Sequence, residues 1–333
     1  MKVLLYSGSK DLIKKSGIGK ALEHQAKALK VAGIPMTTDV SSDYDIVQIN
    51  TVFLRSYFLS LLSRMRHKKV IYYAHSTMED FKDSFIGSNI IAPYFKKWIS
   101  HCYNTGDVII TPTPYSKSLL DKYDEIKKPI LNLSNGVDTD FYKGDGKNRK
   151  RFRKKYKLSE KDKVIISVGH LIERKGILDF IDLARDLPEY KFFWFGSTPK
   201  SIMTPKVREA IANKTDNLFF AGFVSEEELR DAYLGSDLFL FLSHEETEGI
   251  VVLEALSSKI PTLIRDIPVY YKWLVDGENV YKAKDNSEFK EKITKILQKE
   301  LANLTEMGYK LAVERDLKNI GKRLKIIYSQ ADN

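Results

Sequence analysis

Short apolar runs, each followed by a stretch with helical periodicity, recur along the whole chain and limit its possible folds more than any other feature. Strands that alternate with helices in this way form parallel sheets with helices packed on both faces. The pattern therefore predicts an α/β protein with doubly wound parallel sheets. The runs lie at residues 2–6, 45–50, 70–74, 108–112 and 129–133 in the first half, and at residues 164–168, 191–196, 217–224 and 238–242 in the second.

The length of the chain predicts two domains, because 333 residues exceed what one hydrophobic core usually holds. The densest basic run, residues 143–157, contains nine basic residues and one acid, and glycines near its start favour a flexible link. We therefore expect a first domain over residues 1–143 and a second over residues 144–315. Apolar residues on one face predict a closing helix over residues 316–333.

Composition restricts the class of protein and the compartment. Hydrophobic residues make up 43% and charged residues 29%, as in ordinary soluble globular proteins. The single cysteine excludes an intrachain disulfide and fits a reducing compartment. No apolar run approaches the roughly 18 residues of a membrane span, and the first residues form a short strand rather than a signal peptide. The net charge of +10 favours an anionic partner, which could be nucleic acid, anionic lipid or a phosphate-bearing ligand.

The strongest candidate for a binding site is residues 243–256, which read S-H-E-E-T-E-G-I-V-V-L-E-A-L after a buried strand. A strand, a loop with Gly249 and a helix would direct free backbone N–H groups at a ligand, and such helix ends attract phosphate. Glu246 lies in the loop and Glu254 lies about one turn inside the helix. Since carboxylates accept hydrogen bonds from hydroxyls, a ligand with sugar hydroxyls and phosphates fits both parts. The alternative is an acidic loop that caps an ordinary helix.

Three other strand ends carry candidate residues. Gly169 follows one strand, and Arg174, Lys175 and Gly176 follow in the same loop, where the two cations suit a diphosphate. The alternative is an exposed Arg–Lys pair at a helix start. Gly17 and Gly19 follow the first strand and form either a phosphate-binding loop or a plain tight turn.

His75 directly follows the strand at residues 70–74, at the edge of the sheet where ligands bind in open α/β folds. The alternative is a structural histidine. Asp43 and Asp45 form a D-x-D pattern, which we interpret as a turn at the edge of a strand rather than a metal site.

The motifs at both loops resemble those of retaining glycosyltransferases of family 4, which have the GT-B architecture. The spacing Glu246-x7-Glu254, with Ser243, Gly249 and residues 253–256, is similar to the E-x7-E signature of that family. Residues 169–176 are similar to its G-R-L-x-x-x-K-G motif, although His170 replaces the usual arginine and Thr247 replaces a common glycine. The resemblance implies two Rossmann-like domains that face a central cleft, with the closing helix packed on the first domain.

The resemblance also implies roles for particular residues. Lys175 and Arg174 would stabilise the departing diphosphate, Glu254 would hold the ribose, and Glu246 would hold the transferred sugar. Arg174 would supply the charge missing at His170, and the backbone at 222–224 would hold the base. The implied catalytic residues are His75, Glu246, Lys175 and Arg174. The implied donor-binding residues are Gly17, Gly19, Gly169, Arg174, Lys175, Gly222, Phe223, Val224, Thr247, Glu248, Gly249, Ile250 and Glu254. No metal or other cofactor is implied.

The amino-acid sequences of three segments indicate the acceptor. They read E-E-T-E-G-I-V-V-L-E-A-L, R-D-I-P-V-Y and H-S-T-M-E-D-F. They resemble the glycolipid synthases of Gram-positive bacteria. This implies transfer of glucose or galactose from UDP-glucose or UDP-galactose to glucosyl-diacylglycerol, giving a diglycosyl lipid. Residues 53–69 and 90–103 fit basic amphipathic helices that lie on an anionic membrane, although ordinary amphipathic helices have a similar pattern. We expect a cytoplasmic protein that is peripheral on the inner face of the cell membrane.

Two alternatives to glycolipid synthesis remain at this point. The first is an enzyme of the same fold that acts on a soluble or cell-wall saccharide. The second is a non-catalytic basic protein that binds nucleic acid, which is disfavoured because no RNA- or DNA-binding motif surrounds the basic run at 143–157. We therefore expect no nucleic-acid partner.

Overall fold

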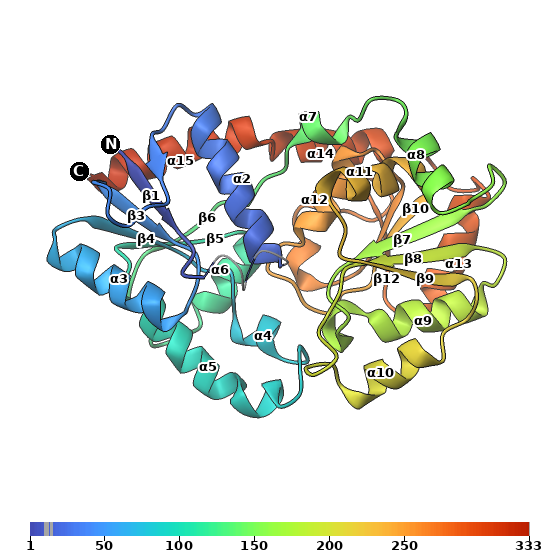
Figure 1. Ribbon diagram of the computed structural model, residues 1–333, viewed down its shortest axis with the longest axis horizontal. Coiled ribbons are helices and arrows are strands. Elements are labelled where there is room, and N and C mark those ends of the chain that lie inside the picture. The colour runs from blue at the N-terminus through green and yellow to red at the C-terminus, as the bar shows by residue number, and fades with distance from the viewer. Residues whose placement is uncertain (10–12, 14–15, 333) are drawn as a thin grey trace. The chain divides into compact units, whose positions relative to one another are not determined.

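A computed structural model describes residues 1–9, 13 and 16–332, and this part of the chain forms two compact units (Figure 1). Unit 1 comprises Met1–Phe81, Asn89–Val137 and Arg315–Asn333, and unit 2 comprises Lys82–Ser88 and Asp138–Glu314. Each unit contains a six-stranded parallel sheet with helices on both faces, which confirms the predicted α/β class. The units divide after Val137, whereas the sequence places the boundary after residue 143.

Unit 1 has the strand order β2-β1-β3-β4-β5-β6. Its strands are β1 (Val3–Tyr6), β2 (Met36–Thr37), β3 (Ile46–Ile49), β4 (Lys69–Tyr73), β5 (Val108–Thr111) and β6 (Ile130–Asn132). Its helices are α2 (Gly17–Val31), α3 (Leu54–Met65), α4 (Met78–Phe81), α5 (Ser88–Tyr103), α6 (Pro114–Leu120) and α15 (Leu317–Asp332). Helices α2 and α15 cover one face of the sheet, and α3 and α5 cover the other (Figure 1). The sequence does not predict β2, because two residues are too short to show a period.

The closing helix α15 packs closely on α2. A Cβ at Gly321 would lie 2.5 Å from the carbonyl oxygen of Ala28, so only glycine allows this approach. The apolar face of α15, which includes Leu317, Ile320 and Leu324, joins the core of unit 1. The helix that follows residue 315 in the sequence therefore packs on the sheet of the first unit.

Unit 2 has the strand order β12-β11-β10-β7-β8-β9. Its strands are β7 (Val164–Val168), β8 (Lys191–Phe195), β9 (Leu218–Gly222), β10 (Leu238–Phe241), β11 (Thr262–Arg265) and β12 (Tyr281–Ala283). Its helices are α7 (Thr139–Tyr142), α8 (Asn148–Lys155), α9 (Ile177–Asp186), α10 (Pro205–Ala212), α11 (Glu226–Gly235), α12 (Ile250–Ser257), α13 (Asn286–Leu297) and α14 (Thr305–Glu314), with 3-10 turns η1 (Glu173–Lys175) and η2 (Pro268–Tyr270). All strands are parallel, so their carboxyl ends share one edge of the sheet.

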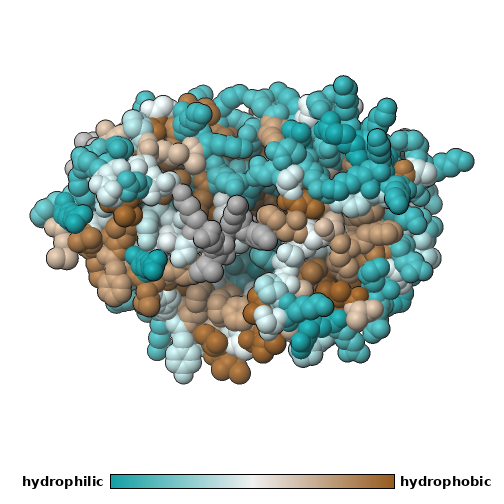
Figure 2. Space-filling model, viewed as in Figure 1, coloured by the Kyte–Doolittle hydropathy of each residue, from teal (hydrophilic) through white to brown (hydrophobic). Residues whose placement is uncertain are grey.

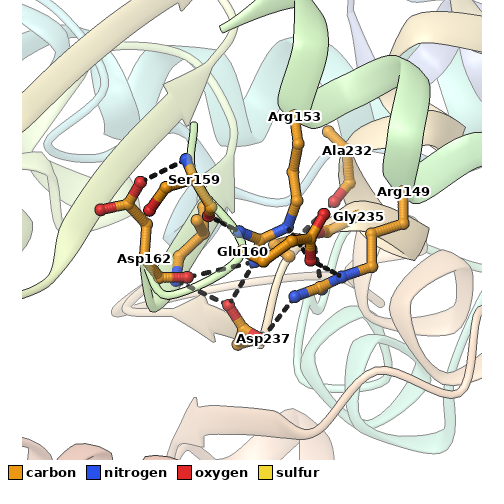
Figure 3. Close-up of polar contacts among 10 residues, drawn as sticks. Arg149, Arg153, Ser159, Glu160, Asp162, Ala232, Gly235 and Asp237 are labelled. Atoms are coloured by element: carbon orange, nitrogen blue, oxygen red, sulfur yellow. Dashed lines mark hydrogen bonds and ion pairs between the residues drawn. The ribbon is translucent and has the colours of Figure 1, made fainter. Parts of the chain in front are cut away.

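The basic run at 143–157 contains α8, and the arginines of this helix are paired within unit 2 rather than fully solvated. The Arg153 side chain is 2% exposed and donates hydrogen bonds to the carbonyl oxygens of Ser159 and Asp162 and to the Asp237 carboxylate (Figure 3). Arg149 donates to the Gly235 carbonyl oxygen at 2.9 Å. These contacts attach α8 to the end of α11 and the segment before β10, although the sequence favours a flexible link in this basic run.

Within the described residues, no helix combines the length and the apolar character that crossing a bilayer requires.

Candidate active site

The loop after β7 is held against the loop after β10 by a close backbone contact. Gly176 has a left-handed conformation with φ of 76°, which favours glycine. A Cβ at this position would lie 2.3 Å from the carbonyl oxygen of Leu242, the residue after β10. Glycine at 176 therefore lets two strand-end loops meet at one edge of the sheet.

Hydrogen bonds between the two loops place the predicted cations beside the predicted acids. The backbone N–H of His244 donates to the Arg174 carbonyl oxygen at 2.8 Å. The Arg174 guanidinium in turn donates from a terminal nitrogen to the carbonyl oxygen of Glu245 at 2.7 Å. Residues 174–175 and 244–246, some seventy positions apart in sequence, thereby form one polar cluster.

Lys175 and Glu246 form an ion pair in this cluster, with side chains that are 16% and 7% exposed. Burial alone would raise the pKa of Glu246, but the charges of Lys175 and Arg174 outweigh burial and hold its pKa below the usual range. Glu246 is therefore ionised at neutral pH, and an ammonium group with three donors lies directly beside it. Such a pair can accept from a sugar hydroxyl and can donate to a phosphate oxygen.

Arg174 is buried, which rules out the alternative of an exposed Arg–Lys pair. Its Nε atom donates to the Ser84 hydroxyl at 3.0 Å, and its backbone N–H donates to the Asp83 carbonyl oxygen at 3.2 Å. With its bond to Glu245, the guanidinium fixes the position of the acidic loop. Arg174 thus holds the loop that contains Glu246 beside the loop that contains Lys175.

Helix α12 begins at the predicted junction after Gly249. This glycine has φ of 81°, and a Cβ here would lie 2.5 Å from the Tyr270 hydroxyl oxygen. The predicted residues around the junction are largely enclosed, since Glu248 and Gly249 are buried and Thr247 and Ile250 are half-buried. The helix end lies next to the acidic loop, as the motif predicts.

Glu254 lies within α12, beyond the acidic loop, and its buried side chain contacts tyrosines. The Tyr233 hydroxyl donates to its carboxylate at 3.0 Å. Burial first, and then the charge of Glu254, raises the pKa of Tyr233 and Tyr142 well above the usual value. Both phenols therefore stay protonated, so they can donate hydrogen bonds. Neither tyrosine was found from the sequence, because no local pattern connects them to Glu254.

The predicted base-binding segment is at the carboxyl end of β9. Gly222 is the last residue of that strand and has φ of 74°, Phe223 is exposed, and Val224 is half-buried. Gly169 follows β7, which is separated from β9 by β8, and its carbonyl oxygen accepts a hydrogen bond from the Trp194 indole at 2.9 Å. The sheet thus places these residues at the same edge as the Lys175–Glu246 pair.

His170 is neutral in this environment. Burial lowers its pKa, although a hydrogen bond to the Ser197 carbonyl oxygen at 3.0 Å opposes that shift. His170 therefore does not replace the positive charge of the arginine that the family motif has at this position. Lys175 and Arg174 are the cations of this loop.

Gly17 and Gly19 lie in the first turn of α2 rather than in a tight turn before the helix. Helix α2 starts at Gly17, so both glycines belong to its first turn. Ser16 caps this turn by accepting from the Gly19 N–H at 3.4 Å. The cap extends the helix over two glycines that have poor helix propensity of their own.

His75 lies just beyond β4 in unit 1, as predicted, and is 9% exposed. Its Nε2 atom lies 3.0 Å from the Asn50 side-chain oxygen, which can only accept, so Nε2 carries the proton and Nδ1 is an acceptor. Burial lowers the pKa of His75 to about 4, so the ring is neutral at physiological pH.

The burial of His75 predicts an acid-sensitive fold. Below its unfolded pKa of about 6.5, the unfolded chain binds a proton that the folded chain does not, so stability falls as the pH falls from about 6.5 to about 4. The full effect is about 3 kcal/mol. Urea unfolding of wild type and His75→Gln should show this extra pH dependence in the wild type alone. Equal pH dependence of the two proteins would contradict a neutral, buried His75.

Asp43 and Asp45 each pair with a different cation. Asp43 lies 3.2 Å from the Lys68 ammonium, and Asp45 lies 3.5 Å from the N-terminal amine. Asp45 also accepts from the Lys2 N–H at 2.7 Å, next to the start of β3. This arrangement agrees with a turn at the edge of a strand.

Comparison with known proteins connects this geometry to a family. The description "Glycosyltransferase Family 4" matches residues 28–141, and "Glycosyl transferases group 1" matches residues 148–311. The processive diacylglycerol alpha-glucosyltransferase of Acholeplasma laidlawii is 44% identical over 331 residues, which cover 99% of this chain and 98% of the relative. The chain belongs to the family 4 glycosyltransferases.

This glycosyltransferase has further relatives in sequence and in fold. The alpha-galactosylglucosyldiacylglycerol synthase of Streptococcus pneumoniae is 27% identical over 304 residues, 89% of this chain and 76% of the relative. The structure of Anabaena HepE with UDP-glucose has a TM-score of 0.80 at 16% identity, covering 99% of this chain and 100% of that one. Sucrose-phosphate synthase of Thermosynechococcus elongatus has a TM-score of 0.82 at 15% identity, with coverage of 99% and 98%. These similarities confirm the GT-B fold.

Proposed function

We propose that this glycosyltransferase moves a hexose from a UDP-sugar to a membrane glycolipid, with glucosyl-diacylglycerol as acceptor and a diglycosyl lipid as product. The observation that carries the proposal is the Lys175–Glu246 ion pair, formed by a half-buried lysine and a buried glutamate of the loop before α12. It combines a cation for a diphosphate with an acceptor for sugar hydroxyls. The acceptor class is supported by the two curated relatives, whose names describe enzymes of diacylglycerol glycolipids. HepE, which shares the fold, was solved with UDP-glucose.

In the proposed reaction, the bond between the sugar and the diphosphate breaks while negative charge grows on the phosphate oxygens. The Lys175 ammonium and the free N–H groups at the start of α12 stabilise this charge. Glu254 holds the ribose hydroxyls, Glu246 holds the transferred hexose, and residues 222–224 contact the base. In unit 1, His75 is the proposed catalytic residue near the donor sugar, and Gly17 and Gly19 are proposed to bind the donor. We propose that no metal is required and that the sugar keeps its α configuration, in agreement with the name of the 44% identical relative.

An outward-facing apolar stripe on α3 supports a membrane acceptor. The buried face of this helix is made of serines, and Ser56 and Ser60 bond to the hydroxyls of Thr51 and Thr105 at 2.6 and 2.7 Å. Tyr57 and Leu59 pack partly buried against the core, but four large apolar residues of α3 are exposed, whereas an ordinary amphipathic helix buries its apolar face. Phe58 is 62% exposed and Met65 is 78% exposed. Since solvent is a poor environment for such a stripe, a lipid surface is the better partner.

We define the membrane-facing patch as this stripe and the exposed apolar residues at the start of α5. The two helices are in contact, because Tyr57 packs on Trp98 with ring centroids 5.6 Å apart. Hydrophobic surface is visible over α3 and over the first turns of α5 (Figure 2). Exposed Arg55, Arg64 and Lys97 lie on the same helices and suit anionic headgroups. The patch consists of Leu54, Phe58, Leu62 and Met65 of α3 and Ile90, Ile91 and Tyr94 of α5.

Replacing Phe58 and Met65 by glutamine should weaken binding to vesicles that contain anionic lipid by at least tenfold. Insertion of these side chains removes apolar area from water, worth about 1.5–3 kcal/mol for each fully buried side chain. Sedimentation with phosphatidylglycerol vesicles measures the effect. Met307→Gln is the matched control, because Met307 is 50% exposed on α14 of unit 2. Equal binding of the double variant and the control would contradict the membrane-facing patch.

The proposed activity is tested by incubating the protein with UDP-glucose or UDP-galactose and with vesicles that contain glucosyl-diacylglycerol. The lipid products are then separated and their linkage is determined by NMR. The proposal expects one diglycosyl lipid and a clear preference for one donor. Transfer to a soluble saccharide but to no lipid would support the rival acceptor class. Binding to DNA or RNA without any UDP-sugar binding would contradict enzymatic function altogether.

A further inference from the structure

Tyr270 has a fully buried hydroxyl with no hydrogen-bond partner among the described residues. It ends the 3-10 turn η2, which follows β11 by way of Asp266 and Ile267, and its exposure is 0%. Its ring packs edge-on against Trp273, with centroids 5.7 Å apart. A buried hydroxyl that finds no partner destabilises the fold, and phenylalanine would fill the same space without that cost. Packing therefore does not explain why this position has a tyrosine hydroxyl.

The hydroxyl lies at the junction between the acidic loop and α12. Its oxygen is so near the Gly249 backbone that a Cβ there would be only 2.5 Å away. The charges of Glu246, Glu248 and Glu245 all act on it, yet none of these carboxylates bonds to it. A phenolic donor thus lies beside Gly249 at the start of α12, within the field of the acidic loop.

The sign of the surrounding charge identifies the kind of ligand atom. Three carboxylates near the hydroxyl disfavour an anionic phosphate oxygen at this point. A neutral sugar hydroxyl fits better, because it can accept from the phenol and donate to the Glu246 carboxylate at the same time. Burial first, and then Glu246 and Glu248, raises the pKa of Tyr270 well above the usual value, so the phenol stays a donor at physiological pH.

We propose that the Tyr270 hydroxyl donates a hydrogen bond to a ring hydroxyl of the transferred hexose and so selects and positions the donor sugar. This inference rests on the proposed function, since it assumes that a UDP-hexose occupies unit 2. It adds to the binding site a side chain from the segment R-D-I-P-V-Y, which lies outside the two loops at 169–176 and 243–256. In this proposal, Tyr270 contacts only the hexose of the donor, and other residues of the site contact the nucleotide.

Tyr270→Phe tests the proposal, because it removes one oxygen and keeps the ring. We expect kcat/KM for UDP-glucose to fall about fivefold to tenfold, as the loss of one neutral hydrogen bond implies. Affinity for UDP, which has no hexose, should stay unchanged in calorimetry. The melting temperature should stay the same or rise, since the hydroxyl has no structural partner.

Tyr281→Phe is the matched control in the same unit. The Tyr281 hydroxyl donates to the Ala302 carbonyl oxygen, so its removal should lower the melting temperature and leave kcat/KM unchanged. The two tyrosines thus predict opposite patterns of stability and activity. If Tyr270→Phe instead lowers stability and leaves kcat/KM intact, the hydroxyl has a structural role and the proposal is wrong.

Donors that lack one ring hydroxyl identify the bonded atom. One UDP-deoxyhexose should lose activity with wild type but show no additional loss with Tyr270→Phe, because both changes remove the same hydrogen bond. Additive losses for every deoxy donor would overturn the assignment. Failure of the proposed function would be distinct, since wild type would then neither bind UDP-glucose nor transfer glucose.

Discussion

Lys175→Gln is expected to lower kcat/KM for UDP-glucose by a factor of about a hundred to a thousand. The ammonium is the proposed donor to the departing diphosphate, and removal of one such preorganised group costs about 2.7–4 kcal/mol of transition-state stabilisation. Steady-state rates with a glycolipid acceptor in vesicles measure the loss. Lys295→Gln is a matched control, because Lys295 is a half-exposed lysine on α13 paired with Glu291 four residues earlier. Equal rates for the two variants would contradict the role of Lys175.

The same substitution should change the titration of Glu246. Lys175 is the strongest of the charges that offset the burial of this carboxylate, so the pKa of Glu246 should rise in the variant. In wild type, the lowered pKa adds stability that is present above the unfolded pKa and is lost as the pH falls through the folded pKa. In Lys175→Gln this contribution becomes smaller or reverses sign. Urea unfolding of both proteins between pH 3 and pH 7 would show the difference, and parallel curves would contradict it.

Arg153→Met is expected to destabilise unit 2 by about 3 kcal/mol. Removing one partner of a buried ion pair typically costs 3–5 kcal/mol, and the lower value applies because Asp237 keeps its bond from the Val164 N–H at 2.8 Å. The Ser159 and Asp162 carbonyl oxygens also lose their donor (Figure 3). Urea unfolding followed by circular dichroism measures the change.

The control for this prediction is Arg185→Met. Arg185 pairs with Asp182 on the surface of α9, and their side chains are 51% and 56% exposed. Such exposed pairs contribute little to stability. If Arg153→Met is as stable as Arg185→Met, the pairing of α8 with the segment before β10 does not hold unit 2 together.

The strands and the loops after them could be predicted because their signals are local. Strand β7 has the same bounds in sequence and structure, since Val164–Val168 is a continuous apolar run that ends at Gly169. The spacing of Glu246 and Glu254 is similarly local, because one loop and one short helix contain both residues. Thr113 and Ser116, which follow β5, form the capping box of α6, and such a cap is also local in the sequence.

The remaining features depend on partners that are distant in the sequence. Arg153 is a charged residue in a basic run, and nothing nearby shows that Asp237 neutralises it from 84 positions away. The serine face of α3 is hidden for the same reason, since Thr51, Thr105 and Tyr44 supply the hydroxyl partners from separate elements. Tyr270 reaches the acidic loop only because η2 follows the neighbouring strand. Local patterns identify the residues that are present, but the sheet order decides which of them meet.

Hydrogen–deuterium exchange of the full chain with UDP-glucose tests most directly whether the Lys175–Glu246 cluster is the donor site. The account predicts that saturating UDP-glucose slows exchange at residues 169–176 and 243–254, while α8 and α13 remain unchanged. Lys175→Gln at the same donor concentration should show weaker protection at both segments. Binding of UDP-glucose that leaves exchange at these two segments unaltered would contradict the account.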